Sequence, residues 1–306
     1  MPAAERIIDF TDAAVHLSMR HEQLVIRRGD DESEVSVPLA ELAAVVLTSP
    51  RLTATQPALA GLARHGCSVI VCDDGFQPAG MMLPLVAHTT QTQRMIAQVR
   101  ASQPVNKRIW RDIVQAKVRA QAVLLQQLHK DDGGLAALAR AVRSGDPMNI
   151  EAQAAQRYWP MLFDDPNFRR FRAAEDQNRL LNYGYAVLRA AIGRALCATG
   201  LHPSIGVHHH SRTNPWCLAD DVMEPYRPLV DAAAVELVGL YTNACPLDGE
   251  AKTMLIGVLT QRLHSDGEER TVFDWISRTA ASLAKVFLGE AKSIFYPDGL
   301  WREGVQ

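Results

Sequence analysis

The hydrophobic pattern of the chain changes once, near residue 90. Before that point, apolar and polar residues alternate over short stretches, and two continuous apolar runs follow, Ala44–Leu47 and Val69–Cys72. Alternation predicts half-buried strands, and continuous β-branched runs predict strands covered on both faces. Between the runs, residues 56–65 have helical spacing and precede Gly66, a typical residue after a helix end. The first 85 or so residues therefore predict a β-rich unit.

After this point, apolar positions recur every three to four residues, which is typical of amphipathic helices. The predicted helices cover residues 107–129, 134–143, 149–162, 176–199, 228–242, 249–264 and 271–289. We therefore expect an α+β protein: a small N-terminal β domain (1–87), a linker (88–93) and a larger all-α C-terminal domain (94–306). The apolar positions of the β domain could supply a dimer interface.

Composition narrows the class of protein. The 306 residues carry 32 Lys and Arg against 34 Asp and Glu, which excludes a uniformly polycationic nucleic-acid coat but not local basic patches. No apolar run approaches the ~20 residues of a membrane span, and the N-terminus predicts no signal peptide. The five cysteines show no C-x-x-C spacing. They favour buried thiols in a reducing cytoplasm over a disulfide framework or a thiolate zinc site.

Two segments offer candidate chemistry of different kinds. Glu151 follows Asn149, an expected N-cap, in the first turn of a predicted helix, where the helix dipole alone favours a carboxylate. A loop farther along carries three consecutive histidines, His208, His209 and His210. Three neighbours cannot all point one way, so at most two of them could bind a common ion. Taken alone, each segment is also compatible with an ordinary structural role.

A third segment places acids close together. Glu224 lies three residues after Asp221 and four after Asp220, so two carboxylates share a helix face. Such acids need a cation or a base nearby, and Arg227 could provide it as an ordinary salt bridge. Combined with Glu151 and the histidines, the set mixes carboxylate and imidazole without thiolate. This donor set suits Mg²⁺ or Mn²⁺ better than structural zinc, and phosphodiester chemistry is its obvious use.

Basic residues gather locally although the overall charge is near neutral. Residues 94–119 contain seven bases and one acid, and a second basic cluster with aromatic neighbours follows at residues 168–172. Lys117 falls on the apolar side of its helix, so it needs either an internal acid or a phosphate entering a groove. An ordinary solvated helix face is the alternative for both clusters. The candidate DNA contacts are Lys107, Arg108, Arg111, Lys117, Arg119, Arg169, Arg170 and Arg227.

One predicted helix carries a polar stripe on an otherwise apolar sequence. Asn178, Asn182 and Tyr185 follow the spacing i, i+4, i+7. Polar groups buried there need partners, so they could support a metal site through hydrogen bonds. Hydrogen bonding within the core, without any such role, explains the stripe equally well.

Four motifs, in residues 145–159, 175–185, 200–209 and 218–228, together resemble the CRISPR-associated adaptation integrase family, in its type II branch. The resemblance covers nearly the whole chain. It implies Glu151, His209 and Glu224 as catalytic metal ligands, with Asp221 as a further ligand. Because His209 has a histidine on each side and Asp221 follows another aspartate, His208 and Asp220 remain register alternatives.

The resemblance also implies an activity and partners. A 3′-hydroxyl of a DNA fragment would attack a phosphodiester at a repeat end with Mg²⁺ or Mn²⁺, and endonuclease activity would use the same site. Double-stranded DNA, a second copy of the chain in a homodimer, and a small ferredoxin-like adaptation protein bridging two dimers are the expected partners. Two other functions remain open from the residues: a zinc hydrolase centred on the triple-histidine loop, and a non-catalytic DNA-binding scaffold.

Overall fold

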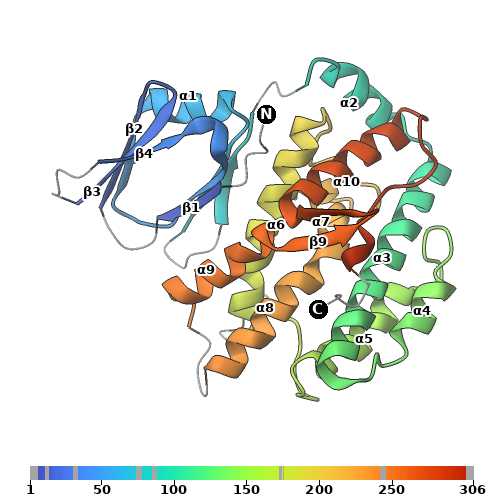
Figure 1. Ribbon diagram of the computed structural model, residues 1–306. Coiled ribbons are helices and arrows are strands. Elements are labelled where there is room, and N and C mark those ends of the chain that lie inside the picture. The colour runs from blue at the N-terminus through green and yellow to red at the C-terminus, as the bar shows by residue number, and fades with distance from the viewer. Residues whose placement is uncertain are drawn as a thin grey trace.

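The computed structural model describes residues 6–10, 14–29, 34–73, 78–84, 88–171, 174, 176–241 and 246–300. Figure 1 shows the N-terminal strands, in blue, beside a larger group of helices in green to red. In the described part of the chain, no helix is long and apolar enough to cross a membrane. The four described cysteines are free thiols, and Cys245 lies outside the described residues.

The N-terminal strands form two four-stranded sheets. One sheet has the order β1-β5-β7-β8 and the other β4-β3-β2-β6. In the first sheet, β1, β5 and β7 are parallel and β8 is antiparallel to β7. The elements are β1 (Arg6–Phe10), β2 (Val15–Arg20), β3 (Gln23–Arg28), β4 (Glu34–Pro38), β5 (Leu42–Leu47), β6 (Leu52–Ala54), α1 (Gln56–Arg64), β7 (Ser68–Cys72) and β8 (Pro78–Met82).

The two continuous apolar runs are strands, as the sequence predicted. Five of the six residues of β5 are buried, and β5 lies between β1 and β7. One apolar core, which includes Leu17, Leu24 and Val45, is built only from residues of this N-terminal part. Strands β1, β6 and β8 carry no clear alternation, and the sequence did not predict them.

The C-terminal part is built around α6, whose residues are mostly buried. It packs against α7, α8, α9 and α10, and its contacts with β5, β7 and β8 join the two parts of the molecule. The Tyr183 hydroxyl on α6 donates to Asp9 on β1 at 3.1 Å. The helices are α2 (Gln91–Val99), α3 (Gln103–His129), α4 (Leu135–Ala141), α5 (Ile150–Leu162), α6 (Asn178–Ala198), α7 (Cys217–Met223), α8 (Arg227–Leu240), α9 (Gly249–Gly257) and α10 (Val272–Phe287).

Two features differ from the sequence prediction. Helix α2 begins at Gln91, so the end of the stretch expected as a linker is helical. The helix expected over residues 249–264 ends at Gly257, and a hairpin of β9 (Arg262–Ser265) and β10 (Glu268–Thr271) follows. Asp266 and Gly267, with φ of 52° and 76°, form its turn. An Asp-Gly pair favours this mirror-image turn. The expectation of an all-α C-terminal part was therefore wrong.

Candidate functional site

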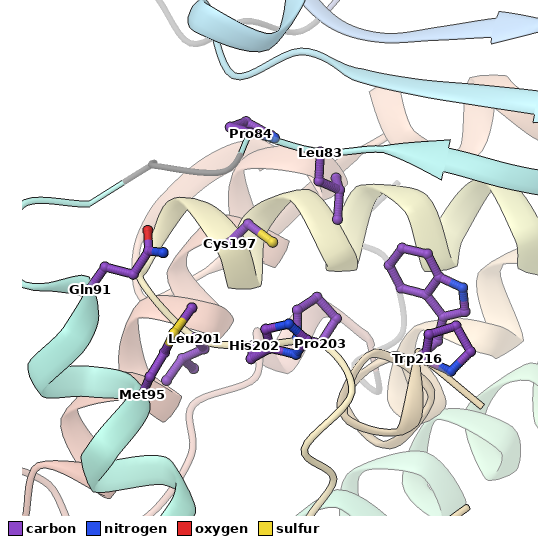
Figure 2. A pocket seen from close by; sticks show the side chains of 10 residues that line it. Leu83, Pro84, Gln91, Met95, Cys197, Leu201, His202, Pro203 and Trp216 are labelled. Carbon is purple, nitrogen blue, oxygen red and sulfur yellow. The ribbon is translucent and has the colours of Figure 1, made fainter. Parts of the chain in front are cut away.

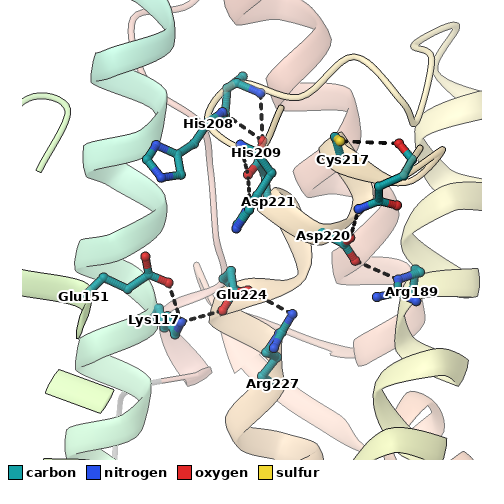
Figure 3. A network of polar contacts seen from close by, with 12 residues as sticks. Lys117, Glu151, Arg189, His208, His209, Cys217, Asp220, Asp221, Glu224 and Arg227 are labelled. Carbon is teal, nitrogen blue, oxygen red and sulfur yellow. Dashed lines mark hydrogen bonds and ion pairs between the residues drawn. The ribbon is translucent and has the colours of Figure 1, made fainter. Parts of the chain in front are cut away.

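Lys117 lies between two carboxylates that are distant in the sequence. Its Nζ donates to Oε1 of Glu151 at 2.6 Å and lies 2.6 Å from Oε2 of Glu224. The lysine comes from the middle of α3, Glu151 from the first turn of α5, and Glu224 from the short 3₁₀ turn Glu224–Tyr226 that joins α7 to α8 (Figure 3). The fold thus gathers the two predicted acids around one ammonium group.

Glu224 is the more deeply placed of the two acids. Its side chain is 4 % exposed, and its Oε1 pairs with Arg227 at 3.0 Å. Burial pushes the pKa of this carboxyl up, but Arg227 and Lys117 outweigh burial and hold the pKa below its ordinary value. For Lys117, burial lowers the pKa, and the two acids more than reverse this effect. Both side chains are therefore charged in the folded protein.

The helix that carries Glu151 is capped by a residue the sequence analysis missed. The amides of Ile150 and Glu151 donate to the Asp146 carboxylate at 2.9 and 3.0 Å. Asn149, the expected N-cap, has left-handed backbone geometry and makes no side-chain capping bond. An acid five residues before Glu151 therefore fixes the start of α5 and the position of the glutamate.

Asp221 anchors the histidine loop to α7. Its two oxygens accept the amides of Val207 (2.7 Å), His208 (3.1 Å) and His209 (3.2 Å), and Nδ1 of His209 lies 2.6 Å from Oδ1. Four donors fill the acceptor capacity of a carboxylate. Asp221 therefore orients His209, and the ligand role expected for Asp221 from the sequence stays a prediction. The hydrogen bond to Asp221 raises the pKa of His209, and a donating Nδ1 leaves the Nε2 lone pair available.

Gly206 allows the loop to approach α7 this closely. A Cβ atom there would overlap the carbonyl oxygen of His209 and would lie 3.0 Å from Oδ2 of Asp221 and 2.9 Å from Cβ of Cys217. Any larger residue would push the loop away from the carboxylate that organises it. The glycine of this motif is thus explained by close approach rather than by flexibility.

His208 and Asp220, the register alternatives to His209 and Asp221, have different contacts from these two residues. The His208 ring stacks on the buried Trp110 ring of α3 with centroids 3.9 Å apart, and burial lowers the pKa of His208. Asp220 accepts Arg189 Nε and Asn214 Nδ2, both at 2.7 Å, and in Figure 3 it lies on the α6 side of α7, away from Glu224. Of the doubled residues, it is His209 and Asp221 that pair with each other.

Three polar residues on α6 divide between two neighbouring structures. Asn178 and Asn182 accept hydrogen bonds from Arg170 at 2.7 and 2.6 Å, so they hold the segment that precedes α6. The Tyr185 hydroxyl donates to Asp231 at 2.5 Å, and the Arg227 guanidinium lies 4.7 Å from the centre of the Tyr185 ring. Tyr185 is therefore linked through Arg227 to the acid pair, and Arg170, 5.3 Å from the centre of the same ring, connects it to the two asparagines.

The predicted basic surface is only partly exposed. Lys107, Arg119 and Arg169 are exposed, whereas Arg108 and Arg111 are half-buried, and Arg111 pairs with Asp112. Lys117, Arg170 and Arg227 bind groups within the protein, as described above. Arg172, in the second basic cluster, lies outside the described residues.

The donor chemistry around Lys117 fits a divalent cation. Oε2 of Glu224 is buried and has no aligned hydrogen-bond donor among the described residues. Two carboxylates already share one cation. The negative charges of both acids help to raise the pKa of the neighbouring His209 imidazole. However, no group of three His, Cys, Asp or Glu side chains in the described residues is close enough to hold a metal as it stands. The two carboxylates are suitable metal ligands, and in this structure the Lys117 ammonium group occupies the position between them.

Two of the hollows near these residues differ in their linings. One, of about 470 Å³, is lined by Lys107, His208 and His210 between α3 and the histidine loop. The other, of about 290 Å³, lies between α2, α6 and the loop before α7, and is lined mostly by apolar side chains such as Met95, Leu201 and Trp216 (Figure 2). None of the predicted site residues lines the second hollow. Of these two, the first adjoins the candidate site, as does a separate hollow of about 570 Å³ lined by Asn106, Gly206 and His210 among others.

Comparison with known proteins points to one family. Residues 10–243 match the family model of the CRISPR associated protein Cas1. The CRISPR-associated endonuclease Cas1 of Neisseria meningitidis serogroup C (strain 8013) is 38% identical over 223 residues, which cover 72% of each chain. Among solved structures, a casposase bound to integration product has a TM-score of 0.79 at 19% identity, over 94% of this chain and 92% of that chain. The chain of a Cas6-RT-Cas1–Cas2 complex has a TM-score of 0.73 at 20% identity, over 95% of this chain and 36% of that one.

Proposed function

Because the chain belongs to the Cas1 family of CRISPR-associated proteins, we propose that it is an endonuclease and integrase of CRISPR adaptation that works with Mg²⁺ or Mn²⁺. The type II branch expected from the motifs is consistent with the meningococcal relative. In the proposed reaction, a 3′-hydroxyl of a DNA fragment attacks a repeat-end phosphodiester, and a new spacer enters the array.

One observation carries this proposal. Glu151 and Glu224, more than seventy residues apart, meet at a single cation, and His209 is oriented beside them by Asp221. An ordinary salt bridge needs one acid and one base. Here, α3, α5 and the turn Glu224–Tyr226 converge to bring two acids together at one cation, which is the arrangement expected of a cation site.

Glu151, Glu224 and the Nε2 atom of His209 would hold the metal ion. When bound, such an ion polarises a phosphoryl oxygen and makes a hydroxyl or water more nucleophilic. Asp221 holds the His209 tautomer that presents a lone pair, and the Asp146 cap fixes Glu151. Arg227 remains on Glu224 and keeps that buried carboxylate ionised.

The hollow beside the histidine loop gives the proposed DNA path. Lys107 is exposed at its edge and can contact a phosphate, while His208 and His210 form the opposite wall. Among the similar structures, a casposase bound to integration product, a TtCas1-DNA complex and a Cas6-RT-Cas1–Cas2 complex support DNA and a further protein as partners, and we propose that the DNA is double-stranded and the protein small. We propose the homodimer and the ferredoxin-like nature of the bridging partner from the family resemblance alone.

The two alternative functions receive less support. A zinc hydrolase centred on this loop would need two of its histidines to face one ion, but His208 stacks on Trp110, Nδ1 of His209 contacts Asp221, and His210 is exposed. A non-catalytic scaffold remains distinguishable by experiment. It does not require the acid pair, so a change of one acid would leave every DNA reaction intact.

The test is Glu151→Gln, which keeps size and polarity and removes one charge. We expect strand transfer of a labelled fragment into a repeat-containing plasmid with Mn²⁺ to be abolished, while duplex binding in a gel-shift assay is largely retained. Glu236→Gln, on α8 and outside the site, is the matched control and should keep both activities. Full strand transfer by Glu151→Gln would refute the proposed function.

A further inference from the structure

The ammonium group of Lys117 stands at the point where the two proposed ligand carboxylates meet. It is 2.6 Å from an oxygen of each, so the two oxygens lie within twice that distance of each other. Mg²⁺ binds carboxylate oxygens at about 2.0–2.1 Å. A metal ion between the same oxygens would therefore require the carboxylates to approach by only roughly half an ångström each. One position cannot hold both cations.

The surroundings of Lys117 explain why it is placed there. Its side chain is only 13 % exposed, and a buried ammonium must be paired. Equally, two carboxylates this close need positive charge between them in the folded protein. With Arg227 on the other oxygen of Glu224, two acids face two bases, so the cluster is formally neutral. Lys117 therefore offsets the repulsion between the two carboxylates that the proposed metal site brings together.

Of the two bases, Lys117 is the one that can be exchanged. The Arg227 guanidinium pairs with Glu224, three residues away on the same turn, and also lies over the Tyr185 ring at 4.7 Å. The Lys117 ammonium ends a flexible four-carbon stem, and in the described residues its ion pairs are with the two acids. Moving it breaks two contacts, both of which a divalent cation replaces.

We propose that Lys117 is a built-in counter-ion of the catalytic acids that a divalent cation must displace, so that this lysine sets the metal affinity of the site. The inference rests on the proposed function, since it takes Glu151 and Glu224 as metal ligands. In the protein prepared without metal, Lys117 stabilises the acid pair and keeps two negative charges from facing the DNA backbone. Exchange of one positive charge for two makes the cluster net positive, which favours a phosphate.

The test measures metal binding directly. Lys117→Met keeps the length of the stem and removes the charge, so Mn²⁺ no longer has to break two ion pairs. We expect the Kd for Mn²⁺, measured by calorimetry and by electron paramagnetic resonance at pH 8, to fall at least about tenfold. Thermal unfolding should show the opposite effect without metal: a lower Tm than wild type, restored by Mn²⁺.

Two controls isolate the effect. Lys107→Met removes an exposed lysine from the same helix and should leave the Kd for Mn²⁺ unchanged. In a Glu151→Gln background, Lys117→Met should tighten Mn²⁺ binding less, because Lys117 then competes with the metal for Glu224 alone. If Lys117→Met does not fold without metal, Lys117→Gln, which keeps a hydrogen-bond donor, should show the same tightening.

The outcomes separate this inference from the proposed function. A folded Lys117→Met or Lys117→Gln protein that binds Mn²⁺ with wild-type or weaker affinity overturns the counter-ion role, while wild-type strand transfer and the Glu151→Gln defect stand. If wild type binds no Mn²⁺ and Glu151→Gln retains strand transfer, the proposed function itself fails.

Discussion

Asp221 holds His209 by both its backbone and its side chain. The His209 amide lies 3.2 Å from Oδ1 of the carboxylate, and Nδ1 of the imidazole lies 2.6 Å from the same oxygen. The side chain of Asp221 is fully buried, so it cannot turn to follow a moving loop. The direction of the imidazole is therefore set by the position of α7.

Asp221→Asn should reduce the rate of strand transfer about 10–100-fold, the usual cost of losing the group that orients a metal-binding histidine. The amide nitrogen would face backbone donors or the imidazole, and neither arrangement preserves all four hydrogen bonds. Initial rates with labelled DNA give the measurement. Asp220→Asn, whose neighbours are Arg189 and Asn214, is the control and should affect the rate much less. Wild-type rates for Asp221→Asn would contradict the orienting role.

Gly206→Ala should both destabilise the protein and reduce activity. The added methyl group overlaps the His209 carbonyl and crowds Asp221, and relief of such overpacking typically costs about 1–3 kcal/mol. Chemical unfolding of the variant measures this loss. Gly239→Ala on α8 adds a methyl group into open space within a helix, so it should be neutral or slightly stabilising. Equal free energies of unfolding for the two variants would show that the loop can move away from the added methyl group without loss of stability.

The buried Asp231 predicts a pH dependence of stability. Burial raises its pKa from 3.8 to about 6, against the lowering effect of hydrogen bonds from Tyr158 and Tyr185. Because the folded state holds this proton more tightly, the contribution of Asp231 is fully present below about pH 4 and is lost as pH rises through about 6. The shift of about two pKa units corresponds to about 3 kcal/mol.

The Asp231 prediction is tested by comparing variants, because other groups also titrate in this range. Urea unfolding of wild type and Asp231→Asn at pH 4, 5, 6 and 7 gives the free energy of unfolding for each. The difference between the two proteins should shift by about 2 kcal/mol between pH 4 and pH 7, in favour of the variant at the higher pH. Parallel curves would mean that Asp231 is ionised throughout.

The exposed Lys107 should contribute to DNA binding through the phosphate backbone. Lys107→Ala is expected to reduce the salt slope of duplex binding by about 1, as for the loss of one phosphate contact. Arg6→Ala, which removes an exposed base on β1 paired with Glu41, should leave the slope unchanged. Fluorescence anisotropy at several salt concentrations measures both slopes. An unchanged slope for Lys107→Ala would remove the hollow beside the histidine loop from the DNA path.

Local sequence features predicted much of the fold because they report burial directly. The continuous apolar runs of β5 and β7 and the amphipathic periods of α3, α5, α6 and α10 were readable, since each element buries a face of its own. The β9–β10 hairpin was missed because residues 249–264 were interpreted as one periodic segment. The Asp266-Gly267 turn was a usable signal against that interpretation.

The sequence by itself determined which acids and histidines were candidates, because residue type and motif order suffice for that. The sequence did not decide whether Lys117 pairs with an internal acid or with a phosphate. It also did not distinguish His208 from His209 or Asp220 from Asp221. Only the tertiary structure decided their contacts: Lys117 lies on two acids, His208 on Trp110, and Asp220 on Arg189. Adjacent residues of the same type cannot be told apart by the local sequence. Their contacts differ only because helices distant in the sequence supply different partners.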